Sequence, residues 1–164
     1  MAIIVTSDQN SICVDLCCGI GPFVIPVARR GIPVLANDLN PDAVKWLRKN
    51  VADNLTPSRA LTAKMKAGNR TNFGKVDILN KDGNDVIRED LYRIVTEGKY
   101  SQVECLMNLP GGAIFFLPAF KGYYAIFMRL QPIIVCHLSA ARSTFKRERK
   151  FHHRRPCLLI RAQV

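Results

Sequence analysis

No apolar run in this sequence is long enough to cross a bilayer, which excludes membrane-spanning helices from the structures to consider. The first eight residues lack the basic start of a secretory signal and the Arg-rich pattern of a transit peptide. The six cysteines include no C-x-x-C pair, and four of them lie in or beside apolar runs, where a thiol behaves as a small hydrophobic group. These absences exclude a disulfide-framed secreted protein and predict reduced, intracellular chemistry.

Acidic residues are scarce, since 13 Asp and Glu stand against 24 Lys and Arg, and the formal net charge is +11. The basic excess is concentrated in residues 142–164, which hold eight bases and one acid. A general polyanion-binding surface is therefore not indicated for the rest of the chain. Because 48% of the 164 residues are hydrophobic, we expect one folded core over residues 1–141 and a poorly ordered basic tail over 142–164.

Apolar runs of strand length alternate with helical patterns along the chain. We expect strands at 12–16, 33–37, 76–79, 103–107 and 132–138, and helices at about 22–30, 41–55, 84–97 and 112–127. Within the second helix, Asn40 before Pro41 is typical of a helix start. The alternation predicts an α/β fold with a parallel sheet. The polar stretch 56–75 is either a solvated loop or a phosphate-contacting loop.

The first two predicted strands each end in a carboxylate. Asp15 ends the first strand and is followed by a G-x-G turn at Gly19 and Gly21, whose glycines let the backbone approach a ligand closely. Asp38 ends the second strand, about 20 residues beyond the turn, which is the spacing at which a carboxylate accepts hydrogen bonds from ribose hydroxyls. The pattern predicts a nucleotide-type cofactor site at the carboxyl ends of parallel strands.

Two further loops follow the third and fourth predicted strands. In Asn80-Lys81-Asp82-Gly83, Asp82 can accept from an exocyclic adenine amine while Gly83 leaves space for the ring; an ordinary Asp-Gly turn is the alternative. In Met107-Asn108-Leu109-Pro110-Gly111-Gly112, Asn108 offers one acceptor and two donors, and a helix cap is the alternative. Because parallel strands end at one edge, we expect all four loops to meet there.

These motifs resemble those of the S-adenosylmethionine-dependent tRNA (guanine-37, N1)-methyltransferases of eukaryotes and archaea. The resemblance rests on four segments: VDLCCGIGPFVIPVARRG, VLANDLNPDAVKWLRKN, VDILNKDGNDVI and MNLPGGAIFFLPAFKG. It covers residues 12–137, with 56–75 as an insertion. The resemblance implies a class I methyltransferase fold, a Rossmann-like sheet of about five parallel strands with flanking helices and with the last strands missing.

The resemblance also implies roles for individual residues. S-adenosyl-L-methionine is the implied cofactor and the tRNA anticodon stem-loop the implied partner, with no metal and no membrane. We expect a monomer in the cytoplasm, with the nucleus and the mitochondrial matrix as alternatives. Asn108 is the implied catalytic residue, which orients the reacting groups at the methionine end of the cofactor. The implied cofactor-binding residues are Asp15, Gly19, Gly21, Asp38, Leu39, Asp82, Gly83 and Asn108.

The chain also departs from the resembling family. The chain starts eleven residues before the apolar run of the first strand, and no glutamate there matches the family's general base. Phe115 stands where relatives usually carry an acidic residue. We therefore expect a chain truncated at both ends that does not turn over by itself. The tail is either non-native or an RNA-contacting segment. The histidines and cysteines of residues 136–157 match no usual zinc spacing.

Three other functions stay open. A tRNA aminocarboxypropyltransferase of the wybutosine pathway would use the same cofactor. A cofactor- or RNA-binding module without catalysis would fit the missing general base. A nicotinamide-dependent dehydrogenase would need a fuller G-x-G-x-x-G turn, and here the third glycine position is Val24.

Overall fold

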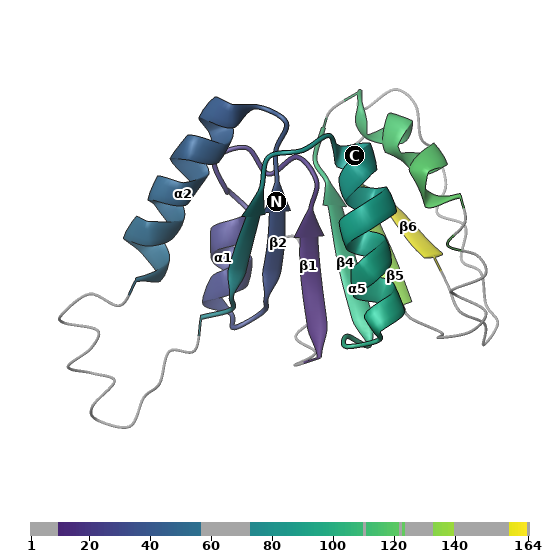
Figure 1. Ribbon diagram of the computed structural model, residues 1–164, viewed down its shortest axis with the longest axis horizontal. Helices are drawn as coiled ribbons and strands as arrows, with labels where there is room; N and C mark the ends of the chain where they lie inside the picture. Colours follow the sequence, from purple (N-terminus) through teal and green to yellow (C-terminus); the bar gives the residue numbers. More distant parts are fainter. Residues whose placement is uncertain are drawn as a thin grey trace.

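The computed structural model describes residues 10–56, 73–109, 111–121 and 123, together with the backbone of 133–139 and 158–163. Its strands form one six-stranded sheet in the order β3-β2-β1-β4-β5-β6, and each strand runs parallel to its neighbours (Figure 1). The strands are β1 (Ser11–Asp15), β2 (Val34–Asn37), β3 (Val76–Leu79), β4 (Gln102–Met107), β5 (Ile133–Ser139) and β6 (Leu158–Gln163). This confirms the predicted Rossmann-like parallel sheet.

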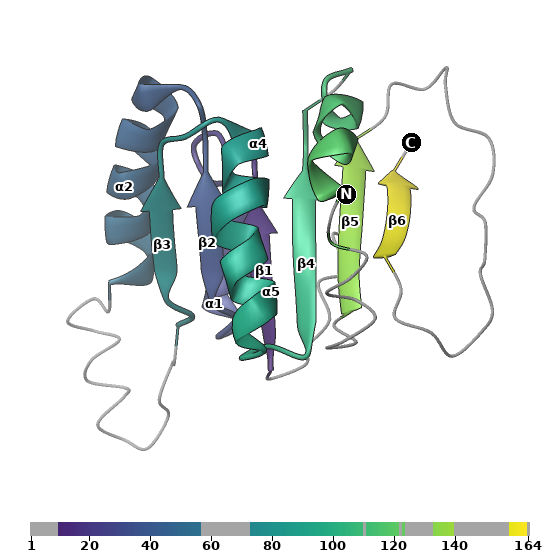
Figure 2. The same cartoon turned by 45° about the vertical axis from the view of Figure 1, so that its right-hand side comes forward.

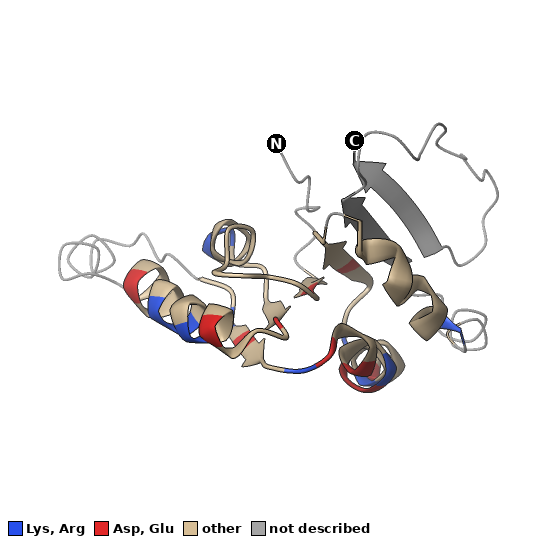
Figure 3. Ribbon diagram, turned by 90° about the horizontal axis from the view of Figure 1, so that it is seen from above, with Lys and Arg blue, Asp and Glu red and all other residues tan. Residues whose placement is uncertain are grey.

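Helical segments cover both faces of the sheet (Figure 2). They are α1 (Val24–Arg29), α2 (Pro41–Leu55), α4 (Gly83–Asp85), the π-helix η1 (Val86–Leu91), α5 (Tyr92–Glu97) and the 3-10 helix η2 (Ala113–Phe120). Seen from above in Figure 3, the ribbon of the strands is mostly uncharged and lies between helices that carry charges of both signs. Among the described residues, no helix has the length and apolarity needed to cross a membrane.

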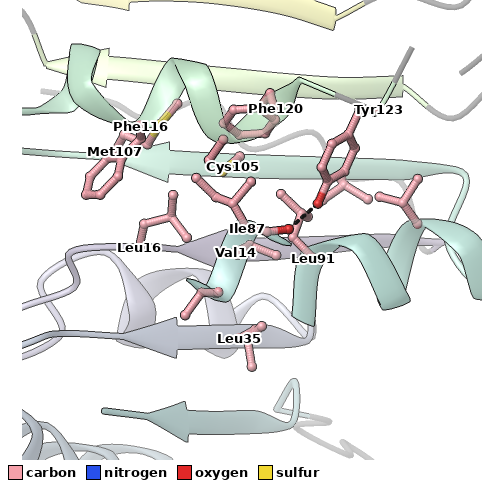
Figure 4. Packing of buried hydrophobic residues seen from close by; sticks show 14 of the residues in the cluster. Val14, Leu16, Leu35, Ile87, Leu91, Cys105, Met107, Phe116, Phe120 and Tyr123 are labelled. Atoms are coloured by element: carbon pink, nitrogen blue, oxygen red, sulfur yellow. Dashed lines mark hydrogen bonds between the residues drawn. The ribbon is translucent and has the colours of Figure 1, made fainter. Parts of the chain in front are cut away.

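The core divides into two layers because successive strand residues point to opposite faces. On one face, Val14 and Leu16 pack with η1, α5 and η2 in the cluster drawn in Figure 4. On the other face, Cys13 and Val34 pack with α1 and with Leu47 of α2. Both faces of β1 are thus buried, as expected for a central strand of a parallel sheet.

The start of α2 agrees with the sequence prediction. Asn40 is the N-cap, and its side-chain oxygen accepts a hydrogen bond of 2.9 Å from the backbone N–H of Asp42, with Pro41 in the first helical position. Leu47 is fully buried, whereas Trp46, one residue earlier, is 55% exposed. The helix therefore contributes to the core through a narrow apolar stripe, and the rest of it faces solvent.

The segment after β4 differs from the helix predicted over 112–127. A 3-10 helix, η2, spans Ala113–Phe120, and beyond Phe120 only Lys121 and Tyr123 are described. Pro118 lies inside η2, and because proline has no backbone N–H it cannot donate the bond that an α-helical turn would require there. The segment is thus wound more tightly than an α-helix.

The sheet has one strand more than the five expected, and this strand lies within residues 142–164. Leu158–Gln163 form β6, which pairs in parallel with β5 in the register Ile134 to Leu158. The apolar run Leu158-Leu159-Ile160 has high strand propensity, and pairing satisfies backbone groups that β5 would otherwise leave open. Residues 142–157 lie outside the described residues, so the prediction of a poorly ordered tail is untested.

The contrast between Leu47 and Trp46 gives a test of the α2 layer. Leu47→Ala should lower the free energy of unfolding by about 2–5 kcal/mol, because it leaves a cavity in a fully buried position. Trp46→Ala, on the exposed side of the same helix, is the control and should cost much less. Urea unfolding of the 164-residue chain measures both, and equal losses would contradict the packing described.

Candidate functional site

Four loops meet at one edge of the sheet, which we call the carboxyl edge: the loops that follow β1, β2, β3 and β4. Asp15, the last residue of β1, opens the first of them, and the others carry Asp38, Asp82 and Asn108 in that order along the chain. The chain leaves β1 toward β2 and β3 on one side and returns to β4 on the other, so the strand order reverses between β1 and β4. Ligands of open parallel sheets bind at such a switch point. Because neighbouring strands are about 4.8 Å apart, the four loops span roughly 14 Å.

The loop after β1 needs its glycines. Gly19 and Gly21 have φ angles of 54° and 95°, in the left-handed region that favours glycine. At Gly21 a Cβ atom would also lie 2.6 Å from the Leu47 Cδ1 atom of α2. The predicted turn is confirmed, and α2 packs directly beneath it.

Asp38 connects this turn to the loop after β2. One carboxylate oxygen accepts a bond of 2.7 Å from the backbone N–H of Gly19, and the other accepts a bond of 2.9 Å from the N–H of Asn40. A carboxylate oxygen has a second acceptor site, so Asp38 can still accept from two hydroxyl groups of a ligand. The sequence predicts Asp38 as a ligand contact, which stays a prediction, and it did not show that Asp38 also shapes the turn.

The loop after β3 places Asp82 and Gly83 at the far end of the carboxyl edge. Asp82 is exposed and caps α4, since one oxygen accepts bonds of 2.7 Å and 3.1 Å from the backbone and side-chain nitrogens of Asn84. Gly83 is buried, and a Cβ atom there would lie 2.7 Å from the Phe116 Cε1 atom of η2. The glycine therefore lets the third loop pack against the segment that follows β4.

Two asparagines hold these loops together, and sequence analysis did not assign them a role. The amide nitrogen of Asn37 donates to the backbone oxygens of Leu16 at 3.1 Å and Lys81 at 3.0 Å, and its oxygen accepts from the Lys81 N–H at 2.9 Å. Asn80 donates to the backbone oxygens of Asp38 at 2.8 Å and Leu39 at 3.0 Å. The available signal was Asn37 itself, a polar side chain in a strand that is buried throughout.

The electrostatics of the site centre on Asp15. The side chain is completely buried, one oxygen accepts a 3.3 Å bond from the Cys17 N–H, and the other oxygen has no partner in the described part of the chain. Burial raises the pKa of Asp15 to about 7, the Asp38 charge adds to the shift, and the Cys17 N–H opposes it. A buried acceptor without a partner, next to the turn, fits a site completed by a ligand that carries donors or positive charge.

The surroundings of Cys17 show that the acidic groups converge. Burial raises the pKa of Cys17 to about 12, and the charges of Asp15, Asp38 and Asp82 contribute further. Three carboxylates from three different loops thus act on one half-buried thiol. A cysteine with such a pKa stays protonated at neutral pH, so we assign Cys17 no nucleophilic role.

Apolar side chains also line the carboxyl edge. Ile20 is 55% exposed, Leu39 67% and Leu109 41%, and each lies in a different one of the four loops. Asn108, between Met107 and Leu109, is half-buried. Exposed apolar groups beside fixed acceptors are typical of a small-molecule site that receives a flat ring.

The residues present fit S-adenosylmethionine better than a dinucleotide. A pyrophosphate would meet the negative charges of Asp15, Asp38 and Asp82, whereas a sulfonium, an ammonium, ribose hydroxyls and an adenine amine would each meet an acceptor. The third glycine of a dinucleotide fingerprint is replaced by Val24, which is fully buried in the core. The geometry thus argues against the dehydrogenase alternative.

Comparison with known proteins points to one family. Residues 1–77 match the TRM5/TYW2 methyltransferase domain. The chain is 38% identical to a tRNA (guanine(37)-N(1))-methyltransferase of Caenorhabditis elegans in an alignment of length 133 that covers 70% of this chain and 25% of that protein. It is 41% identical to the protein of that name from Danio rerio over 111 residues, which is 66% of this chain and 20% of that protein. The chain thus spans about a quarter or less of the length of these relatives.

Solved structures with a similar arrangement also exist. The crystal structure of P. horikoshii TYW2 in complex with MeSAdo is similar with a TM-score of 0.45 and 21% identity, over 70% of this chain and 34% of that one. An RNA methyltransferase from Salinibacter ruber in complex with S-adenosyl-L-homocysteine gives a TM-score of 0.43 and 20% identity, over 70% of this chain and 58% of that one.

Burial of Asp15 predicts an unusual dependence of stability on pH. Its pKa is about 7 in the folded chain against 3.8 as the ordinary value, so the folded state binds the proton more tightly. The free energy of unfolding should therefore fall as pH rises from 4 to 8, by on the order of 4 kcal/mol for a shift of about three units. Asp15→Asn should remove this contribution.

The measurement is urea unfolding at pH 5, 6, 7 and 8. Asp15→Asn should be more stable than the wild type at pH 8 and should lose this advantage toward pH 5. Asp53→Asn, at an exposed position of α2, is the control and should follow the wild-type curve. If the unfolding free energies of Asp15→Asn and the wild type changed with pH in parallel, burial would not raise the pKa of Asp15.

Proposed function

Because the chain belongs to the TRM5/TYW2 methyltransferase family, we propose that it is the cofactor-binding part of an S-adenosylmethionine-dependent tRNA (guanine-37, N1)-methyltransferase. The observation that carries the proposal is the convergence of Asp15, Asp38 and Asp82 at the carboxyl edge, beside exposed apolar side chains. Relatives that share this segment are named for that activity. Since the chain spans only a fraction of those relatives, activity, substrate and partner are proposals for this chain.

The order of the loops suggests how the cofactor would lie. Asp82 would accept from the adenine amine. Gly83 would make room for the ring, and Leu39 would contact it. Asp38, one strand nearer the centre, would accept from the ribose hydroxyls. Asp15 and the Gly19–Gly21 turn, at the switch point, would hold the methionine end. Each assignment follows the order β3-β2-β1 in the sheet.

Asn108 follows β4, on the other side of the switch point from Asp38 and Asp82. When bound, the cofactor supplies an electrophilic methyl group on a sulfonium. Transfer of that methyl group to guanine N1 would leave the neutral thioether and would require the N1 proton to be released. The purine must leave the base stack to reach the site, and the Asn108 amide, with one acceptor and two donors, would fix its orientation. None of the residues placed here is assigned as the proton acceptor.

The partner and the compartment belong to the same proposal. We propose a tRNA anticodon stem-loop as substrate and a monomer as the working state, in the cytoplasm, with the nucleus and the mitochondrial matrix as alternatives. Resemblance to the family is what supports these statements. Incubation with a stem-loop that carries guanine or adenine at position 37 tests the substrate. Product analysis separates a methyl group from the aminocarboxypropyl group that the wybutosine-pathway enzyme would transfer.

Calorimetric titration with S-adenosylmethionine tests the cofactor site directly. Asp82→Asn should weaken binding about tenfold or more, because a hydrogen bond to a charged acceptor contributes about 1.5–3 kcal/mol. Asparagine caps helices as well as aspartate does, so α4 should persist in this variant. Asp38→Ala should abolish measurable binding, since it removes the ribose acceptor and also releases the turn at Gly19.

Asp77→Asn is the matched control for this titration. Both variants replace one carboxylate by an amide. Asp77 lies within β3 and pairs with Lys75, whereas Asp82 lies in the loop after β3. The affinity of Asp77→Asn should equal that of the wild type. Equal affinity of wild type and Asp82→Asn would refute the adenine contact, and absence of binding by a folded wild-type chain would refute the cofactor site.

A further inference from the structure

The segment Asn80–Gly83 carries the proposed adenine contacts, and its position is set by residues outside those contacts. Its backbone is fixed on one side by Asn37, which exchanges two hydrogen bonds with Lys81, at 2.9 Å and 3.0 Å. Asn37 is completely buried and belongs to β2. The peptide groups of Lys81 are therefore tied to the sheet.

The side chain of Lys81 makes a second attachment in a different direction. Its ammonium donates to Asp90 at 2.9 Å and to Glu89 at 3.1 Å, both in η1. The Asp90 side chain is 12% exposed, against 65% for Glu89, and Asp90 also accepts from Arg93 at 3.3 Å. Asp90 is thus the fixed member of this charge cluster and Glu89 its solvent-exposed member.

The element that carries Asp90 is unusual. η1 is a π-helix of six residues between α4 and α5, and π-helical turns are rare and occur frequently at functional sites. Val86, Ile87 and Leu91 of η1 are fully buried in the core. Asp90 is therefore presented to Lys81 from a segment that packing holds in place.

We propose that Asp90 is a positioning residue for the adenine end of the cofactor site, acting through Lys81. With the Lys81 backbone held by Asn37 and its ammonium held by Asp90, the next residue, Asp82, has its direction fixed relative to the sheet. This inference rests on the proposed function, and it adds a residue that does not itself contact the ligand. A carboxylate that must meet one amine benefits from such support, because small errors in direction weaken a hydrogen bond steeply.

The alternative is that the Lys81 pair only stabilises the fold. Exposed ion pairs contribute little to stability, and the Lys81 side chain is 39% exposed, so loss of this pair should change stability little. A positioning role instead predicts a change in which ligand is preferred. The two roles are separable because the positioning role is measured as a ratio of two affinities. A general destabilisation lowers both affinities equally and leaves their ratio unchanged.

The experiment compares S-adenosylhomocysteine with S-inosylhomocysteine, in which a carbonyl replaces the exocyclic amine of adenine. The wild-type chain should prefer the first by about tenfold, since the second presents a carbonyl acceptor to Asp82 in place of the amine donor. Lys81→Met and Asp90→Asn should each reduce this preference to less than about threefold by loosening Asp82. Lys81→Arg, which keeps the charge, should restore it, and Asp77→Asn, which breaks the ion pair with Lys75, should leave it unchanged.

Amide hydrogen exchange of the ligand-free chain provides an independent measurement. Exchange at Asp82, Gly83 and Asn84 should be faster in Lys81→Met and Asp90→Asn than in the wild type and in Asp77→Asn. An unchanged preference in both variants would overturn the proposal, as would unchanged exchange. Equal loss of affinity for both ligands, at constant preference, would assign the pair a structural role and also overturn it.

Failure of the proposed function would look different. A folded wild-type chain that binds neither ligand would refute the cofactor site and the adenine positioning together. Exchange data would then still report whether Asp90 holds the segment. If the wild type bound both ligands with no preference, the cofactor site would stand. The Asp82 contact and the positioning role of Asp90 would both be refuted.

Discussion

The buried amide of Asn37 is the contact on which the carboxyl edge depends. It joins the ends of three neighbouring strands, because it donates to Leu16 after β1 and exchanges two bonds with Lys81 after β3, while its own backbone ends β2. A parallel sheet brings strand ends to one edge but leaves their loops without mutual hydrogen bonds. Asn37 supplies those bonds, and its complete burial makes them hard to exchange for water.

Ligand contacts and structural contacts are made by the same side chains at this edge. Asp38 holds the glycine turn and Asn40, and Asp82 caps α4, so neither carboxylate rotates freely. Acceptors that are already ordered lose little entropy when a ligand arrives. Because these side chains have both roles, removing Asp38 changes the turn as well as the ligand contact. Conservative changes such as Asp82→Asn therefore report on binding more cleanly.

Sequence reasoning located the four loops because each follows an apolar run and carries a local signal, which is a carboxylate, an asparagine or a glycine. The same reasoning missed the contacts of Asn37 with Lys81 and of Lys81 with Asp90. These bonds join different elements across 44 and 9 residues of sequence, and such bonds leave no periodic pattern. It also missed β6, whose apolar run Leu158-Leu159-Ile160 is short and follows a strongly basic stretch. Strand pairing at a sheet edge is a tertiary effect that composition does not reveal.

Charge at the carboxyl edge connects the fold to the proposed function. The Asp38 charge acts on Asp15, which is buried where repulsion is weakly screened, and the charges of Asp15, Asp38 and Asp82 all act on Cys17. A cationic ligand relieves the repulsion, so the carboxylates attract S-adenosylmethionine more strongly than the neutral thioether that remains after methyl transfer. The site would thus favour the substrate form of its cofactor over the product form. Selectivity of this kind requires no contact with the methyl group, only carboxylates that the loops hold close together.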